Sequence, residues 1–205
     1  MRHASHPLGR RRRRLARRVL LGCVVWAVGV ASLSSDPFRP GRWAYRATIR
    51  ARGGTFVSFP GAVLQSGATD CGPAALATLL HTLGGSSPST DSIAKLAGTG
   101  VRGTVLAGLA RAARTLGVAN ELRRLDAAAM DALNTPVIAW VDGGHFVTVV
   151  PDSGAFALVL DPQAGPYRIR RTRLRRYWGG EALVPHATAV EAAVAHPSSH
   201  QGGTT

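Results

Sequence analysis

The sequence has few cysteines and few acidic residues, and each shortage excludes a class of protein. Two cysteines cannot form a disulfide framework, and no cysteines and histidines have the spacing of a zinc site, so we expect no metal and no cofactor. Only 11 acidic residues accompany 25 Lys and Arg, which gives a formal net charge of +14. An apolar content of 45% excludes a disordered chain. The 205 residues therefore suit one folded domain with a short appendage.

The excess positive charge lies in two short segments. Residues 1–18 contain eight arginines, residues 168–176 contain six, and neither segment has an acidic residue. The remaining 11 basic residues equal the 11 acidic ones, so the rest of the chain is neutral. For Arg168–Arg176 we expect an exposed edge strand kept soluble by its charge, with binding of anionic lipid headgroups or of an acidic substrate as the alternative. No aromatic residues are interleaved with these arginines, so we expect no nucleic-acid partner.

The N-terminal arginines precede an apolar run, which is the pattern of a membrane-targeting segment. Fifteen residues without a charge, 19–33, follow Arg18. This length is at the upper end for a signal peptide and short of the about 20 residues of a comfortable membrane span. The pattern favours an uncleaved single-pass anchor through residues 19–35. The alternatives are a cleaved signal with a processing site at 30–32 and a buried core helix. Because positive flanks stay in the cytoplasm, either targeting segment puts the rest of the chain on the exoplasmic side of the cell membrane.

Beyond this N-terminal part (1–35), we expect a linker or stem over 36–59, a folded domain over 60–186 and a flexible tail over 187–205. In the stem, an alternation of apolar with polar residues from Trp43 to Arg50 predicts a strand or an extended segment.

Within the folded domain, helical patterns come first and strand patterns follow. Apolar residues at helical spacing, bounded by capping residues, proline and glycine, predict helices over 73–82, 90–96, 104–116 and 127–133. Runs rich in β-branched residues, separated by turns, predict strands over 136–141, 145–150, 155–160, 167–174 and 182–184. This order indicates an α+β domain in which N-terminal helices pack on an antiparallel sheet.

Cys71 is the candidate nucleophile. It stands directly before Gly72-Pro73, at the start of a predicted helix, where unpaired N–H groups and the helix dipole favour an anion. A cysteine in this place is expected to be more acidic than a free one, and the thiolate is the reactive form. Gly72 is expected to leave space for a substrate backbone. The alternative is a small buried apolar residue at the end of a core helix.

A nucleophilic thiol needs a base and a group that orients the base. His145 begins one predicted strand and Asp161 ends the next. A turn of four or five residues would pair residue 150 with 155 or 156, and would bring His145 opposite residue 160 or 161. Taken singly, His145 is also explained as a polar residue at a strand end, and Asp161 as part of an Asp-Pro turn. Gln65, six residues before Cys71, can join the Cys71 N–H in stabilising an oxyanion.

These motifs together resemble the bacteriocin-processing cysteine peptidases. The matching segments are Gln-x4-Asp-Cys-Gly-Pro-Ala-Ala-Leu (residues 65–76), Gly-His-Phe-Val-Thr-Val (144–149), Asp161-Pro162 with Gly165, and Trp-Gly-Gly-Glu-Ala-Leu (178–183). That family has a papain-like fold and trims double-glycine leaders from peptides, often as the N-terminal domain of an ABC exporter. The resemblance covers roughly residues 60–186. It implies Cys71 as nucleophile, His145 as general base and acid, Asp161 as orienting residue and Gln65 as oxyanion donor.

The context differs from the family pattern. The sequence has no Walker-type loop and is expected to be too short for exporter helices or an ATPase, so we expect a stand-alone peptidase. We predict an exoplasmic, membrane-attached cysteine peptidase that acts on a peptide or protein substrate, with a separate exporter or a secreted precursor as a further partner. The alternatives are a non-catalytic peptide-binding or partner-docking module of the same fold and an enzyme that catalyses transpeptidation.

Overall fold

The computed structural model describes residues 39–186. The predicted membrane segment 19–35 and the predicted tail 187–205 lie outside the described residues. Within residues 39–186, no helix has the length and apolar character needed to cross a membrane.

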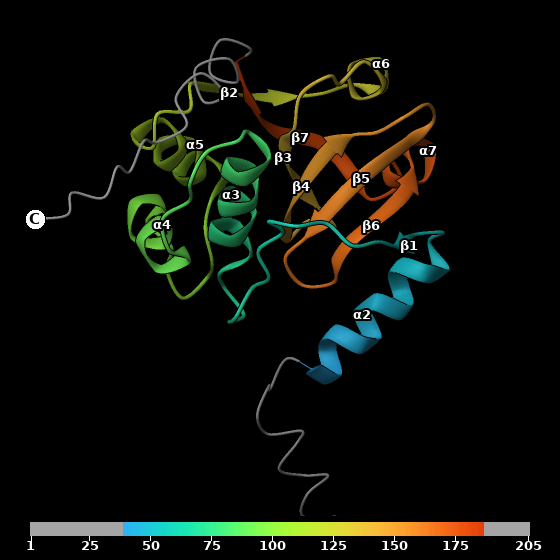
Figure 1. Cartoon of the computed structure of the whole chain (residues 1–205), viewed down its shortest axis with the longest axis horizontal. Coiled ribbons are helices and arrows are strands. Elements are labelled where there is room, and N and C mark those ends of the chain that lie inside the picture. Colours follow the sequence, from blue (N-terminus) through green and yellow to red (C-terminus); the bar gives the residue numbers. More distant parts are fainter. Residues whose placement is uncertain (1–38, 187–205) are drawn as a thin grey trace, which may run out of the picture. The chain divides into compact units, whose positions relative to one another are not determined.

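A seven-stranded antiparallel sheet forms one half of the fold (Figure 1). Its strand order is β1-β6-β5-β4-β3-β7-β2. The strands β3 to β6 pair with their neighbours in the sequence, and β7 returns to pair with the free edge of β3. The strands are Thr55–Phe56 (β1), Asn120–Arg124 (β2), Val137–Val141 (β3), His145–Pro151 (β4), Phe156–Asp161 (β5), Gly165–Arg170 (β6) and Trp178–Pro185 (β7).

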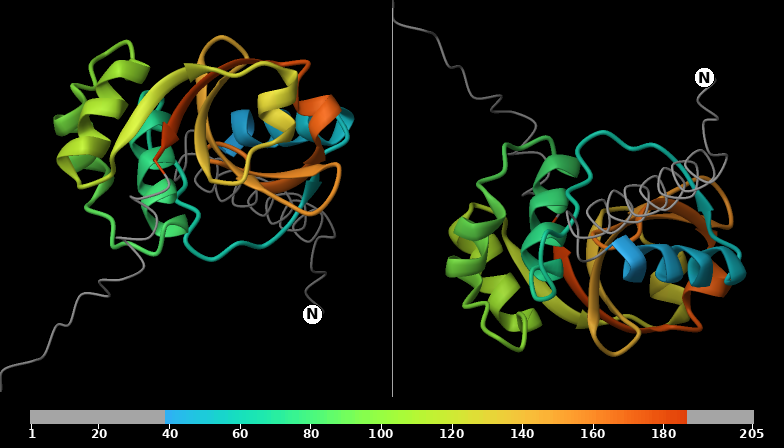
Figure 2. Two further views of the ribbon diagram at one scale, coloured as in Figure 1. Left: turned by 90° about the horizontal axis from the view of Figure 1, so that it is seen from above. Right: turned by 90° about the horizontal axis from the view of Figure 1, so that it is seen from below.

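The helices divide between the two faces of this sheet. Three of them, Cys71–Thr82 (α3), Thr90–Ala97 (α4) and Leu106–Thr115 (α5), gather beside one face and are seen as the green group in Figures 1 and 2. The other face packs against side chains from Arg39–Ala51 (α2), Ala127–Asp131 (α6) and Arg171–Leu174 (α7). This is the α+β architecture that the order of helical and strand patterns predicts.

The sheet contributes to a separate hydrophobic core on each face, because successive side chains of a strand point to opposite sides. In β4, Phe146 packs into the core with α3, α4 and α5, whereas Val147 and Val149 pack into the core with α2, α6 and α7. His145, the first residue of β4, therefore lies at the end of a strand that both cores hold in place.

The sequence predicts helices α3 and α4 well, because capping residues, proline and glycine mark their ends. The structure has α3 at 71–82 and α4 at 90–97, against the predicted 73–82 and 90–96. The Ser89 side chain accepts a hydrogen bond from the Ser92 N–H at the start of α4, and Gly98 ends that helix in the left-handed conformation at φ 69°. Helix α5 begins at Leu106 rather than at the predicted residue 104: Val105 occupies the N-cap position, and the Thr104 hydroxyl lies 2.7 Å from the Thr99 hydroxyl.

The prediction of a strand or extended stem over residues 43–50 is wrong, because these residues belong to helix α2. Pro40 lies in the first turn of this helix, a position that proline tolerates. The buried face is formed at helical spacing by Ile49, which is fully buried, with Arg42, Tyr45 and Arg46 half-buried. Trp43, which the strand pattern would place on the same face as Ile49, is 77% exposed. The expected linker 36–59 thus contains a helix and a strand of the sheet, since Thr55 and Phe56 pair with β6.

Two further expectations for the strands are wrong. The predicted strand 167–174 ends at Arg170, and Arg171 begins the short helix α7, so the arginines of 168–176 do not share one strand. Nor is β6 an edge strand, because it pairs with both β1 and β5. Strand β2 was not expected, since four of its five side chains are exposed and show no alternation of apolar with polar residues.

Candidate active site

Cys71 is the first residue of α3 and is partly exposed. Its neighbour Gly72 is buried, and a Cβ atom there would lie 3.0 Å from Cβ of Thr104 and 3.3 Å from the Phe146 ring. The space beside Gly72 is therefore filled by the protein itself, and the expectation that it receives a substrate backbone is wrong. The glycine instead permits a close approach that fixes the start of α3 against β4.

The pKa of the Cys71 thiol lies below its ordinary value. Burial raises this pKa and is the largest single influence. Hydrogen bonds with the His145 side chain and with the backbone of Phe146 and Gly72, together with the positive charge of His145, act in the opposite direction and outweigh burial. The site therefore stabilises a thiolate, which is the reactive form of cysteine.

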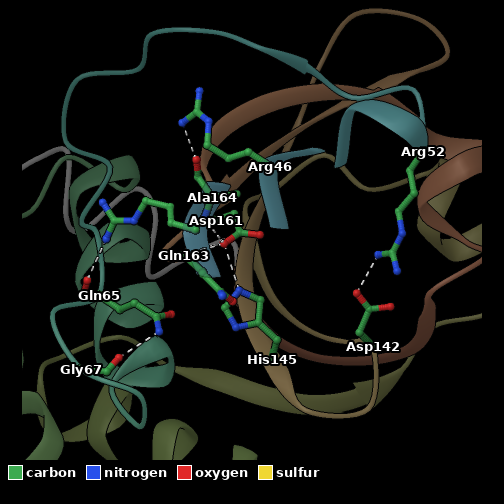
Figure 3. Close-up of polar contacts among 10 residues, drawn as sticks. Arg46, Arg52, Gln65, Gly67, Asp142, His145, Asp161, Gln163 and Ala164 are labelled. Carbon is green, nitrogen blue, oxygen red and sulfur yellow. Dashed lines mark hydrogen bonds and ion pairs between the residues drawn. The ribbon is translucent and has the colours of Figure 1, made fainter. Parts of the chain in front are cut away.

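His145 and Asp161 are in contact, although not through the predicted register. Val150 pairs with Leu158 and Thr148 with Leu160, so Asp161 comes opposite residue 147 rather than His145, and the predicted pairing was wrong by two to three residues. His145 and Asp161 are nevertheless diagonal neighbours on one face of the hairpin, which long side chains can bridge. His145 Nε2 lies 3.0 Å from Asp161 Oδ1, as Figure 3 shows.

The protonated form of His145 is stabilised in this position. Burial lowers the pKa of the ring, but the hydrogen bonds to Asp161 and Cys71 and the charges of both partners raise it from 6.5 to about 9. Since Nε2 faces Asp161, the other ring nitrogen, Nδ1, is the one that remains for the thiol. The arrangement favours an ion pair of a Cys71 thiolate with a His145 imidazolium.

The Asp161 carboxylate is almost fully buried and is held by the turn that follows it. Its Oδ1 atom accepts hydrogen bonds from the backbone N–H groups of Gln163, at 2.7 Å, and Ala164, at 2.9 Å, in addition to the contact with His145. Its Oδ2 atom is buried without a hydrogen-bond partner in the described part of the chain. Three contacts on one oxygen fix the carboxylate plane and therefore the direction in which it meets the imidazole.

Gln65 is buried on the loop before α3 and is tied to the Asp161 turn, because its backbone N–H donates to the Pro162 carbonyl at 2.9 Å. Its side-chain Nε2 donates to the Gly67 carbonyl at 2.9 Å. The amide has a second N–H, which this contact leaves free for an oxyanion. In Figure 3 the Gln65 loop lies on the α3 side of the site and His145 and Asp161 lie on the sheet side.

Asp70 and helix α2 also contribute to the site, and the sequence reasoning missed both. The Asp70 carboxylate accepts hydrogen bonds from the backbone N–H and the hydroxyl of Ser66 and from the Gly67 N–H, at 2.9 to 3.1 Å. It thereby closes the loop that presents Gln65. An Asp four residues after a serine is a signal for such a side-chain-to-backbone turn. For α2, the helical spacing of Arg42, Tyr45, Arg46 and Ile49 was the available signal.

Comparison with known proteins gives the family of this chain. The model of the Peptidase C39 family matches residues 61–189. This chain belongs to the Peptidase C39 family. The C39 peptidase is 34% identical to an uncharacterized protein of Methanothermobacter marburgensis over 122 residues, which cover 60% of this chain and 85% of the relative. A second uncharacterized protein, from Methanothermobacter thermautotrophicus, is 30% identical over the same length.

Solved structures place the C39 peptidase in the same fold as transporter peptidase domains. The peptidase domain of Streptococcus ComA, described as a bi-functional ABC transporter of a quorum-sensing pathway, superposes with a TM-score of 0.54 at 28% identity over 60% of this chain and 97% of that domain. A double-glycine-motif protease from an AMS/PCAT transporter, solved in complex with the leader peptide, superposes with a TM-score of 0.55 at 24% identity over 60% of this chain and 89% of that chain. The fold is papain-like, and the C39 peptidase is a cysteine peptidase.

Proposed function

We propose that this C39 peptidase hydrolyses peptide bonds through a triad of Cys71, His145 and Asp161, with Gln65 as the oxyanion donor. The observation that carries the proposal is the chain of contacts through His145. One ring nitrogen meets a buried, backbone-held carboxylate, and the ring lies close enough to the thiol at the start of α3 to lower the pKa of that thiol. Nucleophile, base and orienting group are then in the relation that thiol catalysis needs.

In the proposed reaction, the Cys71 thiolate attacks the carbonyl carbon of the scissile bond, and the carbonyl oxygen becomes an oxyanion. The backbone N–H of Cys71 and the free N–H of the Gln65 amide stabilise this charge. The His145 imidazolium gives its proton to the leaving amine, and a thioester with Cys71 remains. Water, deprotonated by the now neutral His145, then hydrolyses the thioester and regenerates the Cys71 thiolate and the His145 imidazolium. Asp161 keeps its position and its negative charge throughout.

The substrate we propose is a peptide or protein on the exoplasmic side of the membrane. The apolar segment 19–35 would attach the enzyme to the membrane, and the preceding arginines would stay in the cytoplasm. A double-glycine motif is the first cleavage sequence to test, because the similar AMS/PCAT protease is named for it and was solved with a leader peptide. A separate exporter or a secreted precursor is the proposed partner.

The test is hydrolysis of a fluorogenic peptide amide that ends in Gly-Gly, compared with one that ends in Ala-Ala, by the full-length chain. We expect Cys71→Ala and His145→Ala to abolish cleavage and Cys23→Ala, at the only other cysteine, to retain it. Analysis of the products with an added amine separates hydrolysis from transpeptidation. Cleavage that persists in Cys71→Ala would contradict the proposal, whereas a wild-type chain that binds the peptides without cleaving them would support a docking module.

The location has its own test. If the proposed orientation is right, protease added to spheroplasts degrades the C39 domain while a cytoplasmic marker stays intact. Protection of the domain until the membrane is dissolved would contradict an exoplasmic position.

A further inference from the structure

Helix α2 lies outside the segment that matches the C39 family, which begins at residue 61, yet it contacts the parts of the chain that carry the proposed catalytic residues. Arg42 Nη2 donates to the Gln65 carbonyl at 3.3 Å. Arg46 Nη1 donates to the Ala164 carbonyl at 2.7 Å, on the turn whose N–H groups hold Asp161. One residue after the helix, Arg52 pairs with Asp142 at 2.6 Å, on the turn before His145 (Figure 3).

Tyr45 brings α2 into direct contact with the proposed base. Its ring packs edge to face with the His145 imidazole, with centroids 5.8 Å apart and an interplanar angle of 82°. Burial and the negative charge of Asp161 raise the pKa of its hydroxyl, so the hydroxyl stays protonated. A single side chain from α2 therefore packs on the imidazole ring of the proposed base.

The contact with Tyr45 constrains His145 in a way that its hydrogen bonds do not. The hydrogen bonds to Asp161 and Cys71 act on the two nitrogen atoms, whereas the packing of Tyr45 acts on the whole ring and opposes a change of rotamer. Ile49, one turn further along α2, is fully buried and holds the helix in place. The charged groups of the surrounding elements are occupied elsewhere: Arg42 and Arg46 bind backbone carbonyls, and Arg52 and Asp142 bind each other.

We propose that Tyr45 is a positioning residue of this peptidase, through which α2 holds the His145 ring in line between Asp161 and Cys71. The inference rests on the proposed triad, and it adds a part of the machinery that lies outside the family match. Helix α2 begins at Arg39, four residues after the segment 19–35 that we expect to attach the chain to the membrane.

The test uses three variants of the full-length chain. Tyr45→Ala removes the ring, Tyr45→Phe keeps the ring and removes the hydroxyl, and Trp43→Ala is the matched control, an exposed aromatic residue of the same helix. For each we measure kcat and KM on the Gly-Gly peptide amide, the pH dependence of Cys71 alkylation by iodoacetamide, and the thermal unfolding midpoint.

We expect Tyr45→Ala to lower kcat by about 10- to 100-fold, because small misplacements of a catalytic group have effects of this size, with KM within about threefold of the wild type. The low-pH limit of the alkylation, which reports the pKa of the Cys71 thiol that His145 lowers, should rise by about one pH unit as the ring moves out of line. Tyr45→Phe should restore kcat to within about threefold and restore the limit, because it restores the packing. Trp43→Ala should match the wild type in every measurement.

Three results would overturn the inference: an unchanged kcat in Tyr45→Ala, an unchanged pH limit in Tyr45→Ala with only the unfolding midpoint lowered, or a Tyr45→Phe variant as impaired as Tyr45→Ala. The proposed function is tested separately, by Cys71→Ala. If Cys71→Ala is inactive and Tyr45→Ala is normal, the triad stands and only the role of α2 fails. If Cys71→Ala is active, the triad itself fails, whatever Tyr45 does.

Discussion

The Asp161 side chain offers a perturbation that separates the charge of the orienting group from its geometry. Asp161→Asn keeps an oxygen that can accept hydrogen bonds from His145, Gln163 and Ala164, and removes only the negative charge. The amide nitrogen would replace Oδ2, which has no partner in the described part of the chain. The amide has the same shape as the carboxylate, and papain-like enzymes use asparagine in this role. Asp161→Ala, in contrast, removes all three contacts and leaves buried donors unpaired.

The magnitude follows from the pKa of His145. Its rise from 6.5 to about 9 corresponds to about 3 kcal/mol in favour of the protonated ring, at about 1.4 kcal/mol per pKa unit. Because burial lowers this pKa, Asp161 and Cys71 together contribute more than the net rise, and an equal division assigns at least about 1.5 kcal/mol, or about one pKa unit, to each. Asp161→Asn should therefore lower the high-pH limit of activity from about 9 to about 8 or below.

The assay measures kcat/KM on the Gly-Gly peptide amide from about pH 5 to about pH 10, a range that includes both the low-pH and the high-pH limit of activity. At pH 7 we expect Asp161→Asn to retain activity within about tenfold of the wild type, and Asp161→Ala to lose about 100-fold or more, because its imidazole has no orienting partner. An Asp161→Asn variant with an unchanged high-pH limit would refute the electrostatic reasoning. Equal activity of the Asn and Ala variants would refute the geometric reasoning.

Three other predictions concern neighbouring groups. Gln65→Ala should lower kcat by about 100- to 1000-fold with little change in KM, as expected for the loss of one oxyanion donor, and steady-state kinetics that show a change in KM alone would argue against that role. Asp70→Ala should lower the free energy of unfolding by about 1–2 kcal/mol in urea titrations, because the N–H groups of Ser66 and Gly67 lose their acceptor. It should also lower kcat as the Gln65 loop loosens, and an unchanged kcat would show that the loop needs no such support. In Cys71→Ala, the unfolding free energy should fall as the pH rises above about 6.5, because the folded chain keeps the His145 proton that the unfolded chain loses. The fall should end about one unit below the wild-type pKa of about 9, because Cys71 no longer raises it, and urea titrations that show the same fall in Cys71→Ala/His145→Ala would assign it to another group.

The sequence predicted the elements whose signals are local. Helices α3 and α4 have proline, capping residues and glycine at their ends, and these groups act within a few residues of each other. The residue types at the site were also predictable, since the spacing of Gln65 and Cys71 and the positions of His145 and Asp161 at strand ends lie in the sequence itself. That His145 and Asp161 meet was a correct expectation reached through a wrong register.

The parts that could not be predicted depend on contacts between distant residues. Over the eight residues 43–50, a period of two and a helical period fit about equally well, and the burial of Ile49 between α2 and the sheet decides between them. The hydrogen bond of Arg46 with the Ala164 carbonyl joins residues 118 positions apart. The register of β4 and β5 depends on where their paired residues end, at Pro151 and Ala157. A shift of two residues keeps every side chain on the same face of the sheet, so the alternation of apolar and polar residues does not distinguish the two registers.

The most direct test of the central claim is the rate at which iodoacetamide alkylates Cys71 at pH 6, followed by peptide mapping that separates Cys71 from Cys23. At this pH only about 0.3% of a free cysteine of pKa 8.5 is thiolate, so a thiolate–imidazolium pair should react about 10- to 100-fold faster than free cysteine, after allowance for the lower nucleophilicity of an acidic thiol. We expect this advantage in the wild type and its loss in His145→Ala. A Cys71 that reacts no faster than free cysteine, or that reacts equally fast without His145, would contradict the account.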